Sequence, residues 1–529
     1  MTLDMLLRGA AVLDGTGGEP RRVDVGVRDG RIRYLGTQSP PPAATRQLDM
    51  SGLVLAPGFV DIHTHSDVSL LHDPAGQSKA LQGVTTEVVG NCGYSAFPVH
   101  PQRRAMLADH LARLGDPPTA LGWTDYAGYA DALDAARPAI NVAVLVGHSA
   151  LRIAAMADPY GPAGPDDVDR MRHLLDAALA AGAYGMSTGL THTPSALGDT
   201  AEVSALVAVC ARHDALYATH ARAAAGRELA AIDEAIDTTR ATGGRLQFSH
   251  LALNDPEYWG RATDALDRFD AARAEGLDVA FDVYPYDASS SALIQYLPPW
   301  VQDGGSAGLR ANAGDLDWRR RALDAVRAGF FGGIPWHWDR VVVTAAGPYH
   351  ELTGQSLAAI ATARGHAPER VLLDLCVELG DTVQVVLHYR TEADMTAFLA
   401  HPLSIVGSDG NALPLAGADK PHPRAFGTFP RVLGRYARDA GLFGLAGAVH
   451  KMTLAPARRL GLADRGRIAE GAAADLVAFD PGAIADRATF AEPRQAPTGI
   501  ALTVVAGEIV VRDGALTAAR PGKVLRRAR

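Results

Sequence analysis

The chain has 529 residues, of which 47% are hydrophobic and 21% charged, and its net charge at pH 7 is −9. This length predicts two to four domains, or one large barrel with an appendage. The acidic balance gives no case for a nucleic-acid partner, and no apolar run approaches the roughly 20 residues that span a bilayer.

The N-terminus does not have the apolar core of a signal peptide, because Arg8 interrupts its one short apolar run. The chain contains three cysteines: Cys92, Cys210 and Cys376. An odd and sparse set is not a disulfide framework and is typical of a reducing compartment. We therefore expect a cytoplasmic protein without a membrane partner.

Short alternating runs near both ends of the chain predict strands. One such pair flanks Asp29-Gly30, and Asp-Gly between alternating runs is a strong hairpin signal. Residues 466–515 have the same character. Neither segment holds enough strands to be stable alone. We expect residues 1–56 and 453–529 to combine into one small β-sandwich domain.

Residues 57–452 show a different pattern, in which apolar runs of five to eight residues alternate with longer helical stretches. This alternation predicts βα units and a parallel sheet. The candidate strands are 60–65, 85–92, 142–148, 183–188, 216–220, 246–250, 279–286 and 403–409. Eight strands close a (β/α)8 barrel, so the fold class is α/β with a TIM-like barrel. Residues 295–345 are expected to be an insertion, and they are a candidate lid.

The first candidate strand ends in His63-Thr64-His65. Side chains at positions i and i+2 of a strand point to the same face, so both imidazoles can approach one metal ion. In a barrel, the C-terminal ends of the strands form the active-site mouth. The pair therefore predicts a metal site at that mouth.

Further metal-binding residue types follow other candidate strands. The full set of candidate ligands is His63, His65, Cys92, His220, His250 and Asp409. Nitrogen, thiolate and carboxylate donors suit zinc. Taken singly, a histidine is more often a core residue, Cys92 a small buried hydrophobe and Asp409 a turn residue. Together they predict a metal centre. Six candidates exceed the needs of one tetrahedral ion, which leaves room for a second, weaker ion or for a carboxylate that acts as a base.

The chain resembles the amidohydrolase superfamily and, within it, the N-acyl-D-amino-acid deacylases (D-aminoacylases). The matching segments extend over most of the chain: 57–67, 82–86, 90–93, 185–190, 217–222, 248–250, 282–286, 407–410, 422–424, 427–431 and 473–477. His-x-His alone marks the superfamily. The cysteine of Gly90-Asn91-Cys92-Gly93 is more specific, because related hydrolases usually use a carboxylated lysine to bridge two metals.

The resemblance assigns roles to the candidate residues. It implies that Cys92, His220 and His250 hold a tightly bound zinc ion. It implies that His63 and His65 form a weaker second position shared with Cys92 and Asp409 and that Asp409 is the catalytic acid/base. A separate pair, Arg424 and Tyr284, is implied to contact the free carboxylate of the substrate.

Two departures from the family pattern concern substrate recognition. The family usually has a lysine two residues after the sixth-strand histidine, where this chain has Ala252. The segment 411–420, which leads to His422-Pro423-Arg424, is longer than usual. Both changes leave the metal ligands intact and bear on the amino-acid side chain and on the need for a free carboxylate.

The resulting hypothesis is zinc-dependent hydrolysis of N-acyl-D-amino acids to a carboxylate and a free D-amino acid. The D-configuration comes from the resemblance alone. One alternative is hydrolysis of another linear or cyclic amide, of the dipeptide, hydantoin or dihydroorotate type; Cys92 disfavours the cyclic amides, whereas Ala252 keeps other linear amides open. A non-catalytic scaffold is disfavoured because all six candidate ligands are present.

Overall fold

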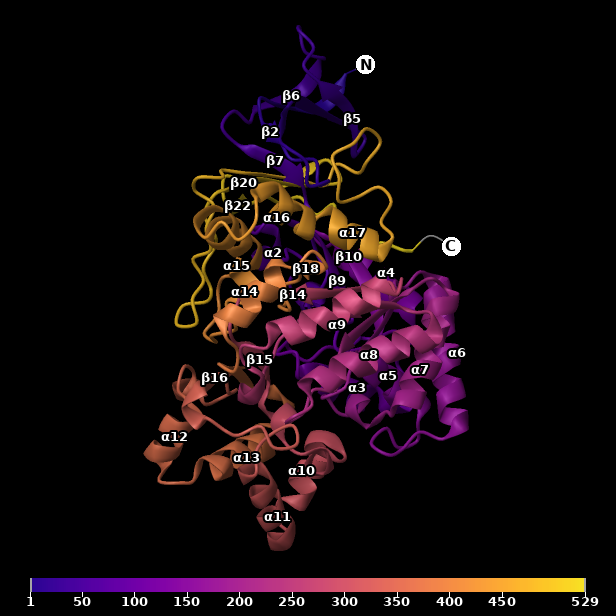
Figure 1. Ribbon diagram of the computed structural model, residues 1–529, viewed down its shortest axis with the longest axis vertical. Helices are drawn as coiled ribbons and strands as arrows, with labels where there is room; N and C mark the ends of the chain where they lie inside the picture. Colours follow the sequence, from indigo (N-terminus) through magenta and orange to yellow (C-terminus); the bar gives the residue numbers. More distant parts are fainter. Residues whose placement is uncertain (1, 528–529) are drawn as a thin grey trace.

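The computed structural model describes residues 2–527, and its centre is a barrel of eight parallel strands (Figure 1). The strands are β8 (Phe59–Asp61), β9 (Val84–Val89), β10 (Asn141–Gly147), β11 (Gly185–Gly189), β12 (Leu216–His220), β13 (Arg245–Phe248), β14 (Val279–Val283) and β18 (Ser404–Val406). They lie side by side in chain order. A bridge between Thr64 and Gly410 links the segments that follow the first and last strands. The predicted (β/α)8 fold is confirmed.

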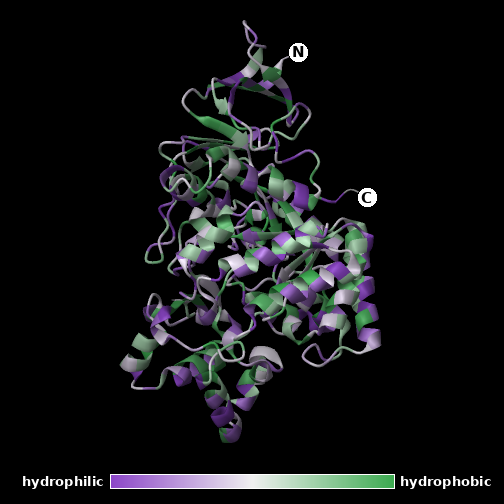
Figure 2. Cartoon of the chain, viewed as in Figure 1, coloured by the Kyte–Doolittle hydropathy of each residue, from purple (hydrophilic) through white to green (hydrophobic). Residues whose placement is uncertain are grey.

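Helices cover the outside of the barrel, and Figure 2 shows that they carry both hydrophobic and hydrophilic residues. They are α1 (Ser69–His72), α2 (Gln77–Ala80), α3 (Arg104–Ala112), α4 (Tyr126–Ala136), α5 (His148–Ala155), α6 (Pro165–Ala181), α7 (Thr200–Arg212), α8 (Glu228–Thr242), α9 (Ala262–Ala274), α14 (Glu392–Ala400), α15 (Arg424–Arg431), α16 (Leu445–Met452) and α17 (Leu454–Leu460). Every residue of β9 and β10 is buried. Such continuous burial is expected where both faces of a parallel sheet are covered.

Local sequence signals set the helix boundaries. α6 begins with Pro165, whose fixed φ suits the first helical position, and it ends at Gly182 with φ 117°. α7 is capped by Asp199, whose carboxylate accepts a hydrogen bond of 2.8 Å from the backbone N–H of Glu202. These signals fix where α6 ends before β11 and where α7 begins after the loop that follows β11, and this loop lies at the mouth of the barrel.

The two ends of the chain form one small β-sandwich. One sheet has the order β5 (Arg31–Gly36), β4 (Asp24–Arg28), β1 (Leu3–Arg8) and β6 (Ala44–Asp49). The other has the order β22 (Ala515–Leu516), β21 (Glu508–Arg512), β20 (Ile500–Val505), β19 (Leu476–Phe479), β7 (Val54–Pro57), β2 (Ala11–Val12) and β3 (Arg21–Arg22). β7 pairs antiparallel with β19, which joins the two termini. The expected sandwich from both ends is confirmed.

The hairpin at Asp29-Gly30 illustrates the local chemistry of this sandwich. Asp29 and Gly30 have φ values of 51° and 68°, and β4 and β5 pair antiparallel on either side of them. Two left-handed residues are what a two-residue hairpin turn requires. Val25 and Ile32 then pack into the same core as Leu476 from the other end of the chain.

An insertion between β14 and β18 forms a separate layer, seen at the bottom of Figure 1. It contains a three-stranded antiparallel sheet and four helices: β15 (Ser289–Ala292), β16 (Val341–Ala345), β17 (Gln384–Leu387), α10 (Gly305–Asn312), α11 (Leu316–Arg327), α12 (Leu357–Arg364) and α13 (Pro368–Leu379). Its hydrophobic core draws on residues 292–389 and therefore extends beyond the expected 295–345. The reason is that the central strand, β17, comes from the end of the segment.

The chain passes from the sandwich into the barrel between β7 and β8, while α17 packs against β8 and β18. We propose that residues 1–56 and 453–529 form the small domain and residues 57–452 the barrel domain, with α17 (Leu454–Leu460) as a part of the small domain that contacts the barrel. In the part of the chain that the structure describes, none of the helices has the length and apolar character needed to cross a bilayer.

Candidate metal centre and substrate cavity

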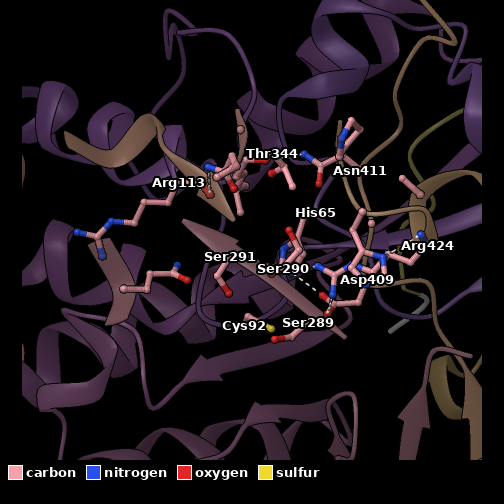
Figure 3. Close-up of a pocket in the computed structure, with 18 of the residues that line it drawn as sticks. His65, Cys92, Arg113, Ser289, Ser290, Ser291, Thr344, Asp409, Asn411 and Arg424 are labelled. Carbon is pink, nitrogen blue, oxygen red and sulfur yellow. Dashed lines mark hydrogen bonds and ion pairs between the residues drawn. The ribbon is translucent and has the colours of Figure 1, made fainter. Parts of the chain in front are cut away.

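The six predicted metal ligands meet at the C-terminal mouth of the barrel. His63 and His65 follow β8, Cys92 follows β9, His220 ends β12, His250 follows β13 and Asp409 follows β18. Figure 3 shows His65, Cys92 and Asp409 around one cavity. The strand ends therefore bring together residues that are hundreds of positions apart in the chain.

The first strand ends earlier than the sequence predicts. β8 ends at Asp61, so the expectation that His63 and His65 lie within the strand is wrong. The chain leaves the barrel ladder here to bond the loop after β18: the Asp409 N–H donates to the His63 carbonyl at 2.8 Å. The two imidazole rings nevertheless stay close, with centroids 5.4 Å apart.

The ligands fall into two groups that share Cys92. One group is Cys92, His220 and His250, and the other is His63, His65, Cys92 and Asp409; within each group the donor atoms lie within 4.8 Å of one another. The Cys92 sulfur lies 3.3 Å from Nε2 of His63 and 3.4 Å from Nε2 of His250. This set of nitrogen, sulfur and oxygen donors fits zinc.

The electrostatics of Cys92, His220 and His250 suit a bound cation. Burial raises the pKa of the Cys92 thiol to about 11, with His63 acting in the opposite direction, so a thiolate here needs a positive charge beside it. Burial lowers the pKa of His250 to about 3 and also depresses the pKa of His220, which keeps both imidazoles neutral. Nδ1 of His220 is buried without a hydrogen-bond partner among the described residues. Neutral imidazoles are the form that binds metal.

Three donor residues have a strained backbone. Cys92, His250 and Asp409 have φ values of 51°, 35° and 53°, in the left-handed region that side chains rarely adopt. Such conformations persist only where the surroundings hold them. The His250 N–H, for example, donates a 2.7 Å hydrogen bond to Oδ1 of Asp282. This concentration of strain is typical of functional sites.

Asp282 orients the site, a role that the sequence analysis did not assign. Its Oδ1 accepts hydrogen bonds from the His250 N–H and from Nδ1 of His63, the latter at 2.9 Å. Its Oδ2 accepts from the Gln247 side chain at 3.0 Å. A carboxylate behind a histidine fixes the ring and leaves its other nitrogen for the metal. The available signal was an acidic residue at the end of the seventh strand.

Asp409 lies between the histidines and Arg424. Its Oδ1 is 2.9 Å from Nε2 of His65 and 3.3 Å from Nε2 of His63, and its Oδ2 accepts a 2.7 Å bond from Arg424. Burial alone would raise the pKa of this carboxyl, but Arg424 and the neighbouring histidines hold it well below its usual value. Asp409 is therefore ionised in this arrangement.

A buried lysine anchors the loop that carries Asp409. Nζ of Lys79 donates to Oδ2 of Asp61 at 2.9 Å, to Oγ of Ser408 at 2.6 Å and to the carbonyl of Gly410 at 2.8 Å. Oδ1 of Asp61 accepts from the Ser408 N–H at 2.8 Å. Lys79 and Asp61 are fully buried. This ion pair holds both neighbours of Asp409 in place, and the sequence analysis did not identify it.

The two predicted substrate-binding residues lie in the same cavity as the metal ligands. Arg424 is stacked over Tyr284, with its guanidinium carbon 4.8 Å from the ring centroid, and it also donates to the Ser290 carbonyl at 3.3 Å. The Tyr284 hydroxyl is buried without a hydrogen-bond partner among the described residues. Figure 3 shows Ser289, Ser290 and Ser291 of β15 near Cys92 and Asp409.

A second cavity adjoins the first and shares His220 and His250 with it. It is largely apolar and contains Ala252, the position where the family usually has lysine, together with Phe330 and Phe331 of the insertion. The small side chain of Ala252 supplies no positive charge to this cavity, whose lining includes Arg390. The lengthened segment 411–420 lines the first cavity through Asn411, Leu413 and Asp419.

Comparison with known proteins identifies the family. A model described as "Amidohydrolase family" matches residues 46–511. N-acyl-D-glutamate deacylase of Alcaligenes xylosoxydans xylosoxydans is 40% identical over 525 residues, which cover 99% of this chain and 97% of that protein. The match therefore extends over both ends of the chain as well as the barrel.

Solved structures give the same result. The N-acyl-D-glutamate deacylase of Bordetella bronchiseptica, complexed with zinc and a phosphonate inhibitor, matches with a TM-score of 0.84 and 38% identity, covering 99% of this chain and 100% of that one. A D-aminoacylase with a binuclear metal centre matches with a TM-score of 0.83 and 37% identity over the same shares of the two chains. The chain belongs to the amidohydrolases and, within them, to the family of N-acyl-D-amino-acid deacylases (D-aminoacylases).

Proposed function

We propose that this protein is a zinc-dependent hydrolase that cleaves the amide bond of N-acyl-D-amino acids, releasing a carboxylate and a free D-amino acid. The observation that carries this proposal is the pair of donor groups sharing Cys92, with Asp409 in contact with the histidines. The relatives support the choice of substrate, because one of them is an N-acyl-D-glutamate deacylase and another a D-aminoacylase.

The residues that hold the metal follow from the two groups. Cys92, His220 and His250 would hold one tightly bound zinc ion, and His63 and His65, with Cys92 and Asp409, would form a weaker second position. A zinc ion at the site would supply positive charge that polarises the amide carbonyl and makes a nearby water molecule easier to deprotonate. Asp282 keeps His63 oriented for this role through its 2.9 Å bond to Nδ1.

Asp409 moves the proton during hydrolysis. Its carboxylate accepts the proton of the attacking water and later delivers it to the nitrogen of the leaving amine. Arg424 holds Oδ2 of Asp409, and His65 contacts Oδ1, so the carboxylate has a defined orientation. The Lys79–Asp61 pair keeps the loop that carries Asp409 from moving during this transfer.

Arg424 and Tyr284 bind the carboxylate of the amino-acid part of the substrate. The planar guanidinium can bind a carboxylate through two parallel hydrogen bonds, and Tyr284 restricts its plane by stacking. The unpartnered Tyr284 hydroxyl can donate a further hydrogen bond. This arrangement supports an enzyme that acts on acylated amino acids, and we propose that its partner is this small-molecule substrate rather than a nucleic acid or a membrane.

We also propose that the enzyme acts in the cytoplasm. Cys92, Cys210 and Cys376 are all free and buried in the structure. Thiols kept free in this way are typical of a reducing compartment.

The central experiment is a hydrolysis screen with zinc content measured in parallel. Purified protein is assayed with N-acetyl-D-amino acids, their L-enantiomers, dipeptides, hydantoin and dihydroorotate. We expect turnover of the N-acetyl-D-amino acids by zinc-containing enzyme. Preferential turnover of a cyclic amide or a dipeptide would overturn the proposal, as would full activity in zinc-free protein.

A further inference from the structure

Arg390 is a charged residue of the cavity that the proposed mechanism does not use. It follows β17 in the insertion, is half-buried and lines both the main cavity and the adjoining apolar one. Its Nε donates to Oδ1 of Asn254 at 3.0 Å, and its guanidinium carbon lies 4.7 Å from the ring centroid of Tyr284. The side chain is therefore held between the two cavities with its terminal nitrogens available.

The other arginines of the main cavity differ from Arg390 in having a carboxylate partner. Arg424 is paired with Asp409 at 2.7 Å, and Arg113 is paired with Asp381 at 2.6 Å. Arg390 has no ion pair with any residue that the structure describes. A guanidinium in a partly buried site without an opposite charge is unfavourable unless a ligand supplies one.

The acidic residue of the adjoining cavity, Glu228, forms no ion pair with Arg390. Glu228 is buried, and its Oε1 accepts hydrogen bonds from the backbone N–H groups of Asn254 and Asp255 at 3.1 and 3.0 Å. Burial raises the pKa of Glu228 to about 7, and Arg390 acts on it in the opposite direction without forming an ion pair with it among the described residues. The unmatched positive charge therefore faces the space where a substrate would lie.

We propose that Arg390 is a substrate-binding residue that receives a carboxylate of the substrate, beside the one proposed for Arg424. This inference rests on the proposed function and names a specificity-determining contact for it. Tyr284 stacks with both guanidinium groups, which restricts their planes before a ligand arrives. The apolar wall formed by Ala252, Phe330 and Phe331 provides no competing charge.

The carboxylate has two possible sources. It can be the α-carboxylate of any N-acyl-amino acid, shared between Arg390 and Arg424. It can also be the side-chain carboxylate of an acidic amino acid, with the α-carboxylate on Arg424. Both sources make the same charge-assisted contact, and the substrate series below distinguishes them.

The test compares Arg390→Met with wild-type zinc enzyme on four substrates: N-acetyl-D-leucine, N-acetyl-D-glutamine, N-acetyl-D-glutamate and N-acetyl-D-leucinamide. Loss of a charge-assisted contact should lower kcat/KM about 10- to 100-fold, mainly through KM, for substrates with the relevant carboxylate. The neutral leucinamide should be unaffected. Where the amide is not turned over, its competitive inhibition constant is measured in its place.

The pattern of losses identifies the source of the carboxylate. Similar losses on leucine, glutamine and glutamate substrates assign the α-carboxylate, whereas a loss confined to N-acetyl-D-glutamate assigns the side chain. Arg390→Lys should recover part of the loss, because it restores the charge without the planar fork. Arg364→Met is the matched control, since Arg364 is an exposed arginine of the insertion that stacks on Tyr349 and lines none of these cavities.

Two results would overturn the inference while leaving the proposed function intact. One is an active Arg390→Met enzyme whose kinetics match the wild type on all four substrates. The other is an equal loss on the leucinamide, which would indicate a structural role. Absence of hydrolysis of every N-acyl-D-amino acid by the wild-type enzyme would instead overturn the proposed function itself.

Discussion

The cavity has one half with the candidate metal ligands, called the metal-binding half, and one half with the proposed substrate contacts, called the substrate-binding half. The chain builds them differently. The metal-binding half is His63, His65, Cys92, His220, His250 and Asp409, all carried on segments that end barrel strands. The substrate-binding half is Tyr284, Ser289–Ser291, Arg390 and Arg424, which follow the barrel strands or belong to the insertion.

The hydrogen bonding of the two halves also differs. In the metal-binding half, Asp282 and the Lys79–Asp61 pair hold donor residues in strained backbone conformations. In the substrate-binding half, Arg390 is held by one hydrogen bond and one stacking contact. The donor residues, which need a fixed geometry, thus lie on the rigid barrel. Arg390, proposed to recognise the substrate, lies in the insertion, and such loop segments are the parts of a fold that can vary.

The largest expected effect comes from removing the proton carrier of the metal-binding half. Asp409→Ala should lower kcat by about 10²- to 10⁴-fold, the usual contribution of a general acid–base. Zinc should stay bound, because Cys92, His220 and His250 form a group without Asp409. Steady-state kinetics with metal analysis measures both. Near-normal turnover would contradict the assignment of Asp409.

The buried lysine tests whether the metal-binding half depends on its support. Lys79→Met leaves the Asp61 carboxylate buried without its cation, and breaking such a pair costs about 3–5 kcal/mol of unfolding free energy. Thermal unfolding and kcat are measured together. The double variant Lys79→Met with Asp61→Asn should be more stable than Lys79→Met alone. Unchanged stability in the single variant would show that the pair supports nothing.

Asp282 tests the orientation of the metal ligands with a smaller change. Asp282→Asn keeps the size of the side chain but removes the charge behind His63, and substitutions of this kind cost about 10- to 100-fold in metal affinity or activity. Zinc affinity is measured by competition with a chelator. Asp317→Asn, at an exposed carboxylate of α11, is the control and should have wild-type affinity. Equal affinities for the two variants would contradict the role of Asp282.

The smallest effect is expected at Arg424, which contacts both halves. Arg424→Lys keeps the charge and loses the planar fork, so KM for an N-acetyl-D-amino acid should rise by roughly 10-fold, about one charge-assisted hydrogen bond. Comparing the change in KM with the change in kcat shows whether Arg424 acts mainly in substrate binding or mainly through Asp409. A fall in kcat with unchanged KM would assign Arg424 to Asp409 and the metal-binding half.

The candidate ligands could be predicted from the sequence, whereas the residues that hold them in place could not. A metal site was predicted from the residue types of His63, His65 and Cys92 and from their positions near strand ends. Lys79 carries no such signal, and Asp282 carries only its strand-end position, because both residues acquire their roles from partners that are distant in the chain. Their hydrogen bonds span up to 331 positions, as between Lys79 and Gly410.

The extent of the insertion was also hard to predict from the sequence, because it depends on contacts between distant segments. The pattern of eight buried strands was sufficient to predict the barrel, because each parallel strand is buried on both faces and is therefore continuously apolar. The extent of the insertion was predicted too short, since β17 completes its sheet from the far end of the segment. The antiparallel pairs between β15 and β17, from Ser289 with Leu387 to Ala292 with Gln384, join strands so distant in the chain that no local signal identifies the partner.

The sequence by itself determined the fold class, the candidate metal donors and the family, because periodicity, residue type and motif spacing are properties of short segments. Only the tertiary structure decided that Cys92 is shared by two donor groups, that Lys79 and Asp282 hold the site, and that Arg390 faces the substrate cavity without a carboxylate partner among the described residues. Each of these depends on distances between segments that the barrel brings together, and on which buried charges compensate one another there.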